Sequence, residues 1–102
     1  MASTQKQSST RVKERTKLRK PRNYKVIMHN DDVTTMEFVV NVLESVFFKP
    51  HDTAVDLMMT IHNTGEAVVG IYSRDIAESK AQKAMDLAEQ QGFPLKLTCS
   101  PE

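Results

Sequence analysis

Branched apolar side chains are nearly absent from the first 23 residues of this chain and frequent after them. The segment MASTQKQSSTRVKERTKLRKPRN contains only Val12 and Leu18 of this kind. Such a segment buries too little apolar surface to offset the entropy that is lost on ordering. We therefore expect residues 1–22 to be a flexible basic extension and residues 23–100 to form one folded domain. A domain of this size buries only about 60% of the surface of its unfolded chain, so a shallow surface pocket is expected rather than a deep active site.

Charge is divided along the chain in the same way. Residues 1–23 hold eight Lys or Arg and one acidic residue, Glu14, which gives +7, and residues 24–102 hold six Lys or Arg and twelve Asp or Glu, which gives −6; the sum is the formal net charge of +1. The basic segment has two general interpretations: contacts with nucleic-acid phosphates, or an organelle-targeting role, because it is rich in Ser and Thr and nearly free of acidic residues.

Cysteine content and hydropathy set further limits. Cys99 is the only cysteine, which excludes an internal disulfide framework and a cysteine-rich zinc site and is typical of a reducing compartment. No apolar stretch reaches the roughly 18 residues of a membrane span, and the N-terminus lacks the apolar segment of a secretory signal. These features predict a cytoplasmic protein that does not associate with a membrane.

Hydrophobic periodicity predicts three strands and three helices. In YKVIMH, Tyr24, Val26 and Met28 share one face of a strand, and β-branched or aromatic residues are frequent. Later segments repeat apolar residues with the 3.6-residue period of a helix or the two-residue period of a strand. The predicted elements are, in order, a strand at 24–29, a helix at 34–49, a helix at 52–62, a strand at 66–72, a helix at 73–91 and a strand at 95–99.

Several helix termini carry recognisable signals. The motif TTME, from Thr34 to Glu37, has the form of a capping box, in which the Thr34 hydroxyl accepts from the Glu37 N–H. Gly65 predicts a left-handed end for the second helix. Ser73 predicts a side-chain cap for the third.

The element order β-α-α-β-α-β predicts a small α+β domain. Because it is too short for a doubly wound sheet, we expect a three-stranded, mostly antiparallel sheet covered by helices. Gly70 in the second strand is expected to allow the close approach of a neighbouring element. The third helix is expected to pack closely through a narrow face formed by Ala77, Ala81, Ala84 and Ala88.

Three polar residues, Asn30, Asp31 and Asp32, follow the first strand directly. In this position Asn and Asp are most often turn formers, but the predicted Thr cap leaves them without an evident local task. One functional alternative is a metal or hydrolytic site that includes His29 or His62, although no recognised ligand spacing is present. The other is recognition of a positively charged amine, for which the three residues and a neutral His62 would supply acceptors.

The sequence resembles the ClpS family, the bacterial adaptors that deliver N-degron substrates to the AAA+ Clp protease. YKVIMHNDDVTTMEFVVNVL resembles that family's strand, Asn-Asp-Asp loop and first helix, and DLMMTIHNTGEAVVGIYSRDIAESKA resembles its second helix, His, Gly turn, strand and third helix. The resemblance covers residues 22–98. It implies a non-enzymatic adaptor without a cofactor or metal, whose partners are N-degron proteins and the N-terminal domain of a Clp unfoldase.

The same resemblance assigns roles to individual residues. Asn30, His62 and the Asp31/Asp32 pair would hold the α-amino group of the substrate, with Asp32 as the direct acceptor. Met36 would exclude β-branched first residues, and Asp75 and Lys80 would contact the unfoldase. A cavity for Leu, Phe, Tyr or Trp would be lined by Met28, Thr34, Met36, Val39, Met58, Ile61 and Leu95.

Two alternatives remain open beside the adaptor. A general protein-interaction domain of related fold, like the C-terminal domain of the ribosomal stalk protein, would need no amine pocket. A metal-dependent hydrolase would need ligands around Asp32. In the ClpS family a flexible N-terminal extension serves to hand substrate to the unfoldase; we prefer this role for the basic segment and expect no nucleic-acid partner.

Overall fold

The computed structural model describes residues 22–102. The predicted flexible extension at residues 1–22 falls, except for Arg22, outside the described residues, and its role in substrate handover stays a prediction. Within residues 22–102, no helix combines the length and the hydropathy needed to cross a bilayer.

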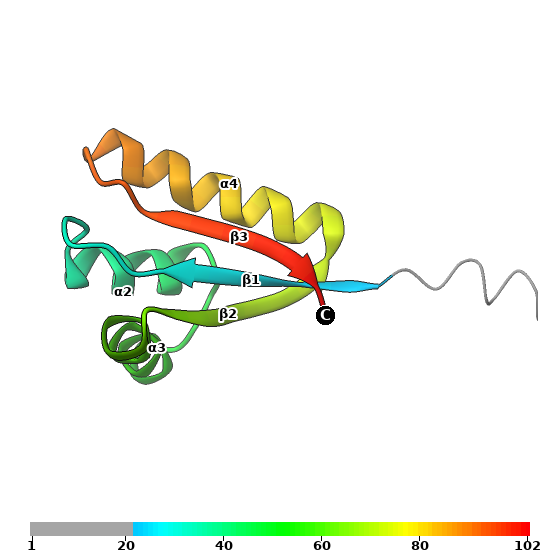
Figure 1. The fold of residues 1–102 in the computed structure, drawn as a ribbon, viewed down its shortest axis with the longest axis horizontal. Coiled ribbons are helices and arrows are strands. Elements are labelled where there is room, and N and C mark those ends of the chain that lie inside the picture. Colours follow the sequence, from blue (N-terminus) through cyan, green and yellow to red (C-terminus); the bar gives the residue numbers. More distant parts are fainter. Residues whose placement is uncertain (1–21) are drawn as a thin grey trace, which may run out of the picture.

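The predicted element order β-α-α-β-α-β is confirmed (Figure 1). Both outer strands pair with the central one in antiparallel orientation, in the order β2-β1-β3, so the predicted antiparallel sheet is confirmed as well. The elements are β1 (Asn23–His29), α2 (Met36–Ser45), α3 (His51–Thr64), β2 (Glu66–Ser73), α4 (Arg74–Gln90) and β3 (Lys96–Pro101).

One face of the sheet packs against the helices. Val26 and Met28 of β1 are fully buried and Leu97 of β3 nearly so, as the alternation of YKVIMH predicts. Helix α4 contacts all three strands, and its predicted alanine face is buried throughout. No buried polar or charged residue occurs within the described part of the chain, so the core is entirely apolar. The alanine face consists of Ala77, Ala81, Ala84 and Ala88.

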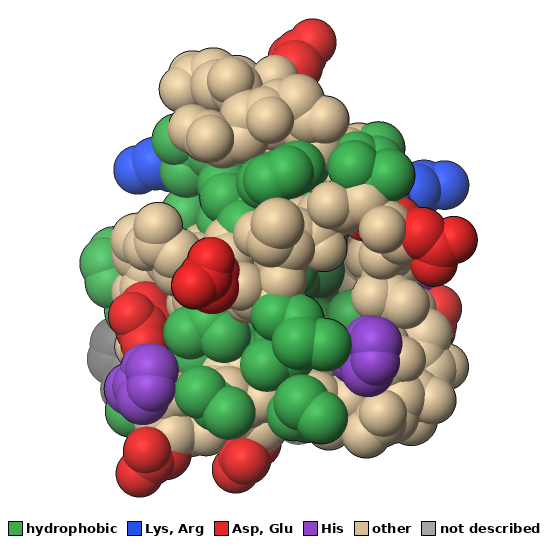
Figure 2. Space-filling model, turned by 90° about the vertical axis from the view of Figure 1, so that its left-hand side faces the viewer, with side chains coloured by type: hydrophobic (Ala, Val, Ile, Leu, Met, Phe, Trp, Pro, Cys, Tyr) green, Lys and Arg blue, Asp and Glu red, His purple; other side chains and the backbone are tan. Residues whose placement is uncertain are grey.

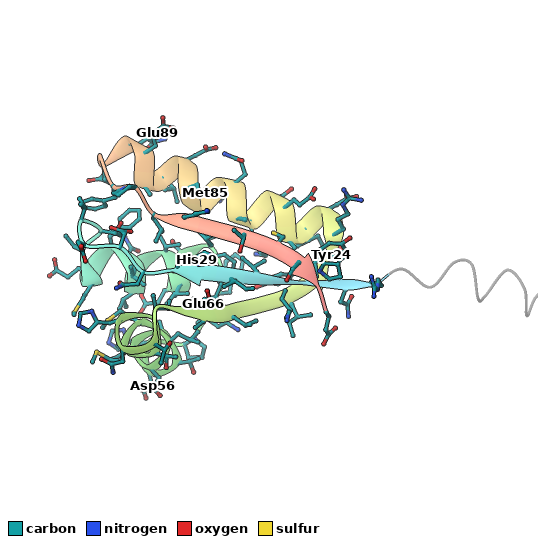
Figure 3. All side chains as sticks on the ribbon, in the orientation of Figure 1. Tyr24, His29, Asp56, Glu66, Met85 and Glu89 are labelled. Carbon is teal, nitrogen blue, oxygen red and sulfur yellow. The ribbon has the colours of Figure 1, made fainter. Side chains whose placement is uncertain are left out.

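The opposite face of the sheet remains partly open. Val68 and Ile71 are exposed on it. His29 lies on this face at the end of β1 and joins all three strands: its Nε2 is 2.9 Å from the Thr98 hydroxyl of β3, and its Nδ1 is 3.3 Å from the Glu66 carboxylate of β2. Figure 3 shows His29 beside Glu66. This polar bridge holds the three strands together at the end where β1 leads into α2.

The close contact at Gly70 comes from its own strand and not, as its position predicted, from a neighbouring element. A Cβ at Gly70 would overlap the end of the Tyr72 side chain, because the Tyr72 ring folds back over its own strand. The ring also lies near Phe47, with 6.4 Å between the ring centroids. The neighbour is therefore a side chain of the same strand.

The first helix is shorter than the sequence predicts. It ends at Ser45, because Phe48 adopts a left-handed conformation with φ of 53°, and the Lys49 N–H donates to the Leu43 carbonyl oxygen at 3.0 Å. Lys80 of α4 donates to the carbonyl oxygen of Val46, the C-cap residue, at 2.7 Å. A long-range contact thus satisfies one of the carbonyl groups that a helix end leaves unpaired.

The predicted signals at the end of α3 and at the start of α4 have different outcomes. Gly65 caps α3 with φ of 100°, so the predicted left-handed end is confirmed. Ser73 occupies the N-cap position of α4 with an extended backbone, but its side chain makes no capping hydrogen bond, so the predicted side-chain cap is wrong.

Candidate functional site

A cavity of about 410 Å³ opens at the end of the molecule where β1 leads into α2. Its volume lies within the range of small-molecule pockets. Figure 2 views this end and shows apolar side chains gathered between histidine and acidic ones. The lining residues come from the β1–α2 loop, the first turns of α2 and the last turns of α3: Asn30, Asp31, Asp32, Val33, Thr34, Thr35, Met36, Val39, Met58, Ile61 and His62.

The sheet and the end of α3 bring Asn30 and His62 to the same cavity. His29 at the end of β1 pairs with Glu66 at the start of β2. The Asn30 N–H then donates to the carbonyl oxygen of Gly65, the C-cap residue of α3, at 2.9 Å. Because His62 lies in the last turn of that helix, this bond places the loop beside it.

Asp31 organises the loop between β1 and α2. Its Oδ1 accepts from the Val33 N–H at 2.8 Å and from the Thr34 N–H at 2.7 Å, and its Oδ2 accepts from the Thr34 hydroxyl at 2.7 Å. Partial burial raises the pKa of this carboxyl, but the hydrogen bonds from Thr34 and Val33 outweigh it, so the pKa lies below its ordinary value of 3.8. Asp31 therefore has the local turn role that is common for Asp in such loops.

The predicted capping box at Thr34 is wrong for the same reason. Asp31 binds both the Thr34 hydroxyl and the Thr34 N–H, so the Thr34 side chain serves the turn. The N-cap is the next residue, Thr35, which has an extended backbone (φ −75°, ψ 152°) and accepts from the Phe38 N–H at 3.1 Å. Helix α2 consequently begins at Met36.

Asp32 also lines the cavity but differs from Asp31 in exposure and in hydrogen bonding. It is exposed, and it makes no side-chain hydrogen bond or salt bridge with any of residues 22–102. Since the carboxylate lines the cavity, its oxygen atoms are available to a ligand. The adjacent Asp31 has both oxygens engaged.

Helices α2 and α3 supply the apolar part of the cavity. Val39 and Ile61 are buried in the core and present their outer surfaces to it, while Met58 is half-buried. Met36 is 46% exposed at the margin. A methionine there can change shape at low cost, since its unbranched side chain has three rotatable bonds.

Most of the residues expected at the cavity do line it, and two do not. Met28 is fully buried and Leu95 is 5% exposed; both belong to the core rather than to the wall of the cavity. Val33 and Thr35 line it without having been expected. The sequence could have indicated these two residues, because both lie in the loop that carries Asp31 and Asp32. The expected residues that line the cavity are Asn30, Asp31, Asp32, Thr34, Met36, Val39, Met58, Ile61 and His62.

The described residues show no metal centre. No three His, Cys, Asp or Glu side chains of residues 22–102 lie close enough together to hold an ion. His29, considered above as a ligand, pairs with Thr98 and Glu66 and does not line the cavity.

Asp75 and Lys80, the expected contacts of the unfoldase, lie on α4. Asp75 is exposed in the first turn, where the helix dipole favours a carboxylate. Lys80 is half-buried; besides its bond to Val46, its Nζ lies 4.5 Å from the centroid of the Phe48 ring and 5.3 Å from that of Tyr72. Lys80 thus has a structural role at the end of α2.

Comparison with known proteins identifies the family. The family model described as "ATP-dependent Clp protease adaptor protein ClpS" matches residues 19–98. This chain belongs to the ClpS family. The match covers nearly the whole described part of the chain, including every residue of the cavity.

Individual ClpS relatives agree with this assignment. The ClpS 2 adapter of Agrobacterium fabrum (strain C58) is 51% identical over 86 residues, which is 84% of this chain and 84% of the relative. The ClpS adapter of Desulfatibacillum aliphaticivorans is 46% identical over 86 residues, 84% of this chain and 83% of the relative. A solved structure of Agrobacterium tumefaciens ClpS2 bound to L-phenylalaninamide is similar with a TM-score of 0.79 and 51% identity, covering 81% of this chain and all of that one.

Proposed function

We propose that this protein is a non-enzymatic adaptor that binds the free N-terminal residue of substrate chains and delivers them to a Clp unfoldase. The cavity carries this proposal, because polar acceptors from the β1–α2 loop and α3 adjoin apolar side chains of α2 and α3. The ClpS2 relative bound to L-phenylalaninamide supports it. That ligand has a free α-amine, an aromatic side chain and an amide in place of the carboxylate, as the first residue of a peptide does.

The amine is bound by Asn30, Asp32 and His62. An ammonium group carries three donors, and an amide oxygen, a carboxylate and a neutral imidazole are suitable acceptors for them. We assign the carboxylate contact to Asp32 because Asp31 already accepts three hydrogen bonds within the loop. Asp31 acts as a positioning residue that holds the turn in shape.

The side chain of the first residue enters the apolar part of the cavity. Val39 and Ile61 form its buried surface and Met58 its flank. The substrates are chains that begin with Leu, Phe, Tyr or Trp. Met36 at the margin rejects Ile and Val, whose branch at Cβ would meet its side chain next to the substrate backbone.

Neither half of the interaction is sufficient alone. Burying a Leu or Phe side chain contributes about 1.5–3 kcal/mol, and each hydrogen bond to a charged group contributes about 1.5–3 kcal/mol. Association itself costs several kcal/mol of lost rotational and translational freedom, estimated at roughly 4–15 kcal/mol. With a blocked amine or a small first residue, the remaining favourable free energy is therefore too small to give useful affinity.

The unfoldase contacts the exposed side of α4, with Asp75 as an ionic contact. Lys80 lies on the same helix, and its bond to Val46 holds the end of α2 against α4. Lys80 therefore contributes to the docking surface chiefly by fixing the exposed Phe48 ring beside α4. The unfoldase domain that forms the other side of the contact is the N-terminal one in this proposal.

Fluorescence anisotropy with labelled peptides tests the binding function. The peptides differ only at the first residue, Leu or Phe against Ala, and each is prepared with a free and an acetylated amine. We expect measurable binding only for free Leu and Phe. Equal binding of the acetylated forms would contradict an amine pocket and favour a general interaction domain, which needs no such site.

A further inference from the structure

A second depression lies next to the cavity, in the groove between α2 and α3. Its volume is about 370 Å³. It shares Met36 and Met58 with the first cavity, so these two side chains separate adjoining spaces on one surface. We call it the α2–α3 groove. Its lining residues are Met36, Glu37, Val40, Asn41, Glu44, His51, Val55 and Met58.

The groove combines an apolar floor with acidic side chains. Val40, Val55 and Met58 are half-buried along it. Glu37 is exposed and forms no salt bridge with any of residues 22–102. Glu44 pairs with Nδ1 of the exposed His51. Among residues 22–102, no Lys or Arg lines the groove, so His51 is the only groove side chain of this part of the chain that can carry a positive charge.

We propose that the α2–α3 groove binds a basic side chain, Arg or Lys, at the third position of the substrate. This inference rests on the proposed function and names a further preference of the same substrates. Arg and Lys suit the site because their aliphatic stems cover apolar surface while their charged ends stay at the edge in water. The stem would lie on Val40 and Val55, and the charged end would reach Glu37 or Glu44, which lie about two helical turns apart on α2.

The third position follows from the geometry of an extended chain. Successive side chains of such a chain point to opposite sides, so the first and third point to the same surface. The first enters the cavity, and the groove continues from it across Met36 and Met58. The net charge of −6 on residues 24–102 also favours a basic substrate, but it acts at every position alike. A local preference for position three separates the groove from that general attraction.

The test uses the full chain and four labelled peptides of one length with a free amine. They begin Leu-Ala-Ala, Leu-Ala-Arg, Leu-Arg-Ala and Ala-Ala-Arg, and anisotropy at low salt gives each dissociation constant. We expect Leu-Ala-Arg to bind about two- to fivefold more tightly than Leu-Ala-Ala, and Leu-Arg-Ala to show less than half of that gain. In the double variant Glu37→Gln/Glu44→Gln, the ratio of the first two constants should fall to near one.

A matched variant controls for long-range charge. Glu89→Gln removes an exposed carboxylate from α4, and Figure 3 shows Glu89 on the opposite side of the domain from Asp56 of α3. The gain from Arg at position three should persist in this variant. An equal gain at positions two and three, or an equal loss in Glu89→Gln, would show a general attraction and overturn the proposal.

Two further outcomes separate this inference from the function on which it rests. If Leu-Ala-Ala itself fails to bind, the amine pocket is wrong, and the groove proposal falls with it. If Leu-Ala-Ala binds and Arg at position three adds nothing, the groove proposal alone is wrong. The unfoldase is the other candidate occupant of the groove. If adding unfoldase abolishes the tighter binding of Leu-Ala-Arg while Leu-Ala-Ala stays bound, the groove belongs to the unfoldase and the proposal is wrong.

Discussion

Asp31 and Asp32 are adjacent carboxylates for which the structure predicts different consequences of mutation. Loss of Asp31 should lower stability, and loss of Asp32 should lower peptide affinity. Asp31 accepts hydrogen bonds from Val33 and Thr34, three in all, at 2.7–2.8 Å. Asp31→Ala removes all three. By analogy with the loss of a helix N-cap, we expect a decrease in the free energy of unfolding of about 0.5–2 kcal/mol. In a domain of this size, each kcal/mol lowers the melting temperature by about 4–8 °C.

Two substitutions with Asn refine this comparison. Asp31→Asn keeps an oxygen for the two backbone N–H groups and loses the acceptor for the Thr34 hydroxyl, so it should cost less than Asp31→Ala. Asp32→Asn removes the charge from a carboxylate that makes no side-chain hydrogen bond or salt bridge within the described chain. Its unfolding free energy should therefore change by no more than about 0.5 kcal/mol. Its affinity for a free Leu peptide should fall roughly tenfold to 150-fold, because a hydrogen bond to a charged group contributes about 1.5–3 kcal/mol.

The pH dependence gives an independent check on Asp31. Since its pKa is lowered in the folded protein, the charged carboxylate stabilises the fold above the ordinary value of 3.8, and this contribution is lost as the pH falls through the lowered pKa. The stability difference between the wild type and Asp31→Asn should therefore shrink as the pH is lowered below 3.8. Urea unfolding measures the stability of each variant, and peptide anisotropy measures its affinity. The assignment of roles is refuted if Asp32→Asn destabilises the fold as much as Asp31→Ala, or if it leaves the affinity unchanged.

Three further substitutions test the gate and the fold. Met36→Ala should admit peptides that begin with Ile or Val, and their continued exclusion in anisotropy measurements would place the gate elsewhere. Lys80→Met keeps the aliphatic stem but removes the hydrogen bond to the Val46 carbonyl, and should lower the free energy of unfolding by about 0.5–1.5 kcal/mol; an unchanged urea midpoint would argue against this structural role. Gly70→Ala should destabilise by about 1–3 kcal/mol because its Cβ would overlap the Tyr72 ring, and most of this loss should disappear when Tyr72→Ala is already present.

The strand and helix pattern was predictable because each element buries one face. Val26 and Met28 alternate with polar or less buried residues, and the alanines of α4 recur at helical spacing, so local periodicity already indicates which side faces the core. The left-handed end of α3 was predictable for a similar reason: Gly65 adopts a φ of 100° without the strain that a Cβ would add. These properties depend on residues within a few positions of one another.

The predictions that failed concern competition between local partners. Thr34 and Thr35 fit the N-cap position equally well by residue type, and the choice between them was made by Asp31, which binds the Thr34 hydroxyl. Likewise, the apolar pattern of the first helix continues past Ser45, but the left-handed Phe48 ends the helix earlier. Sequence pattern ranks candidate caps without showing which hydrogen bond forms.

The resemblance to ClpS named most of the residues that line the cavity and favoured Asp32 as the amine acceptor, but it did not show that Asp31 holds the turn. The resemblance to ClpS placed Asn30 and His62 in one site, 32 residues apart, and the antiparallel pairing of β1 with β2 explains how they meet there. Met28, however, lies in the core rather than on the cavity wall, because the alternation that makes it part of a strand also directs it inward.

The amino-acid pattern alone accounts for the order of elements, their buried faces and the loop that carries the acceptors. Tertiary packing placed Asn30 and His62 in the lining of one cavity, because the Asn30 N–H donates to the carbonyl oxygen of Gly65 at the end of α3. It also formed the α2–α3 groove, whose two walls come from helices that meet only in the folded domain. The physical reason is that secondary structure and the hydrogen bonds within a turn depend on near neighbours, whereas a cavity or a groove depends on groups that tertiary packing brings together.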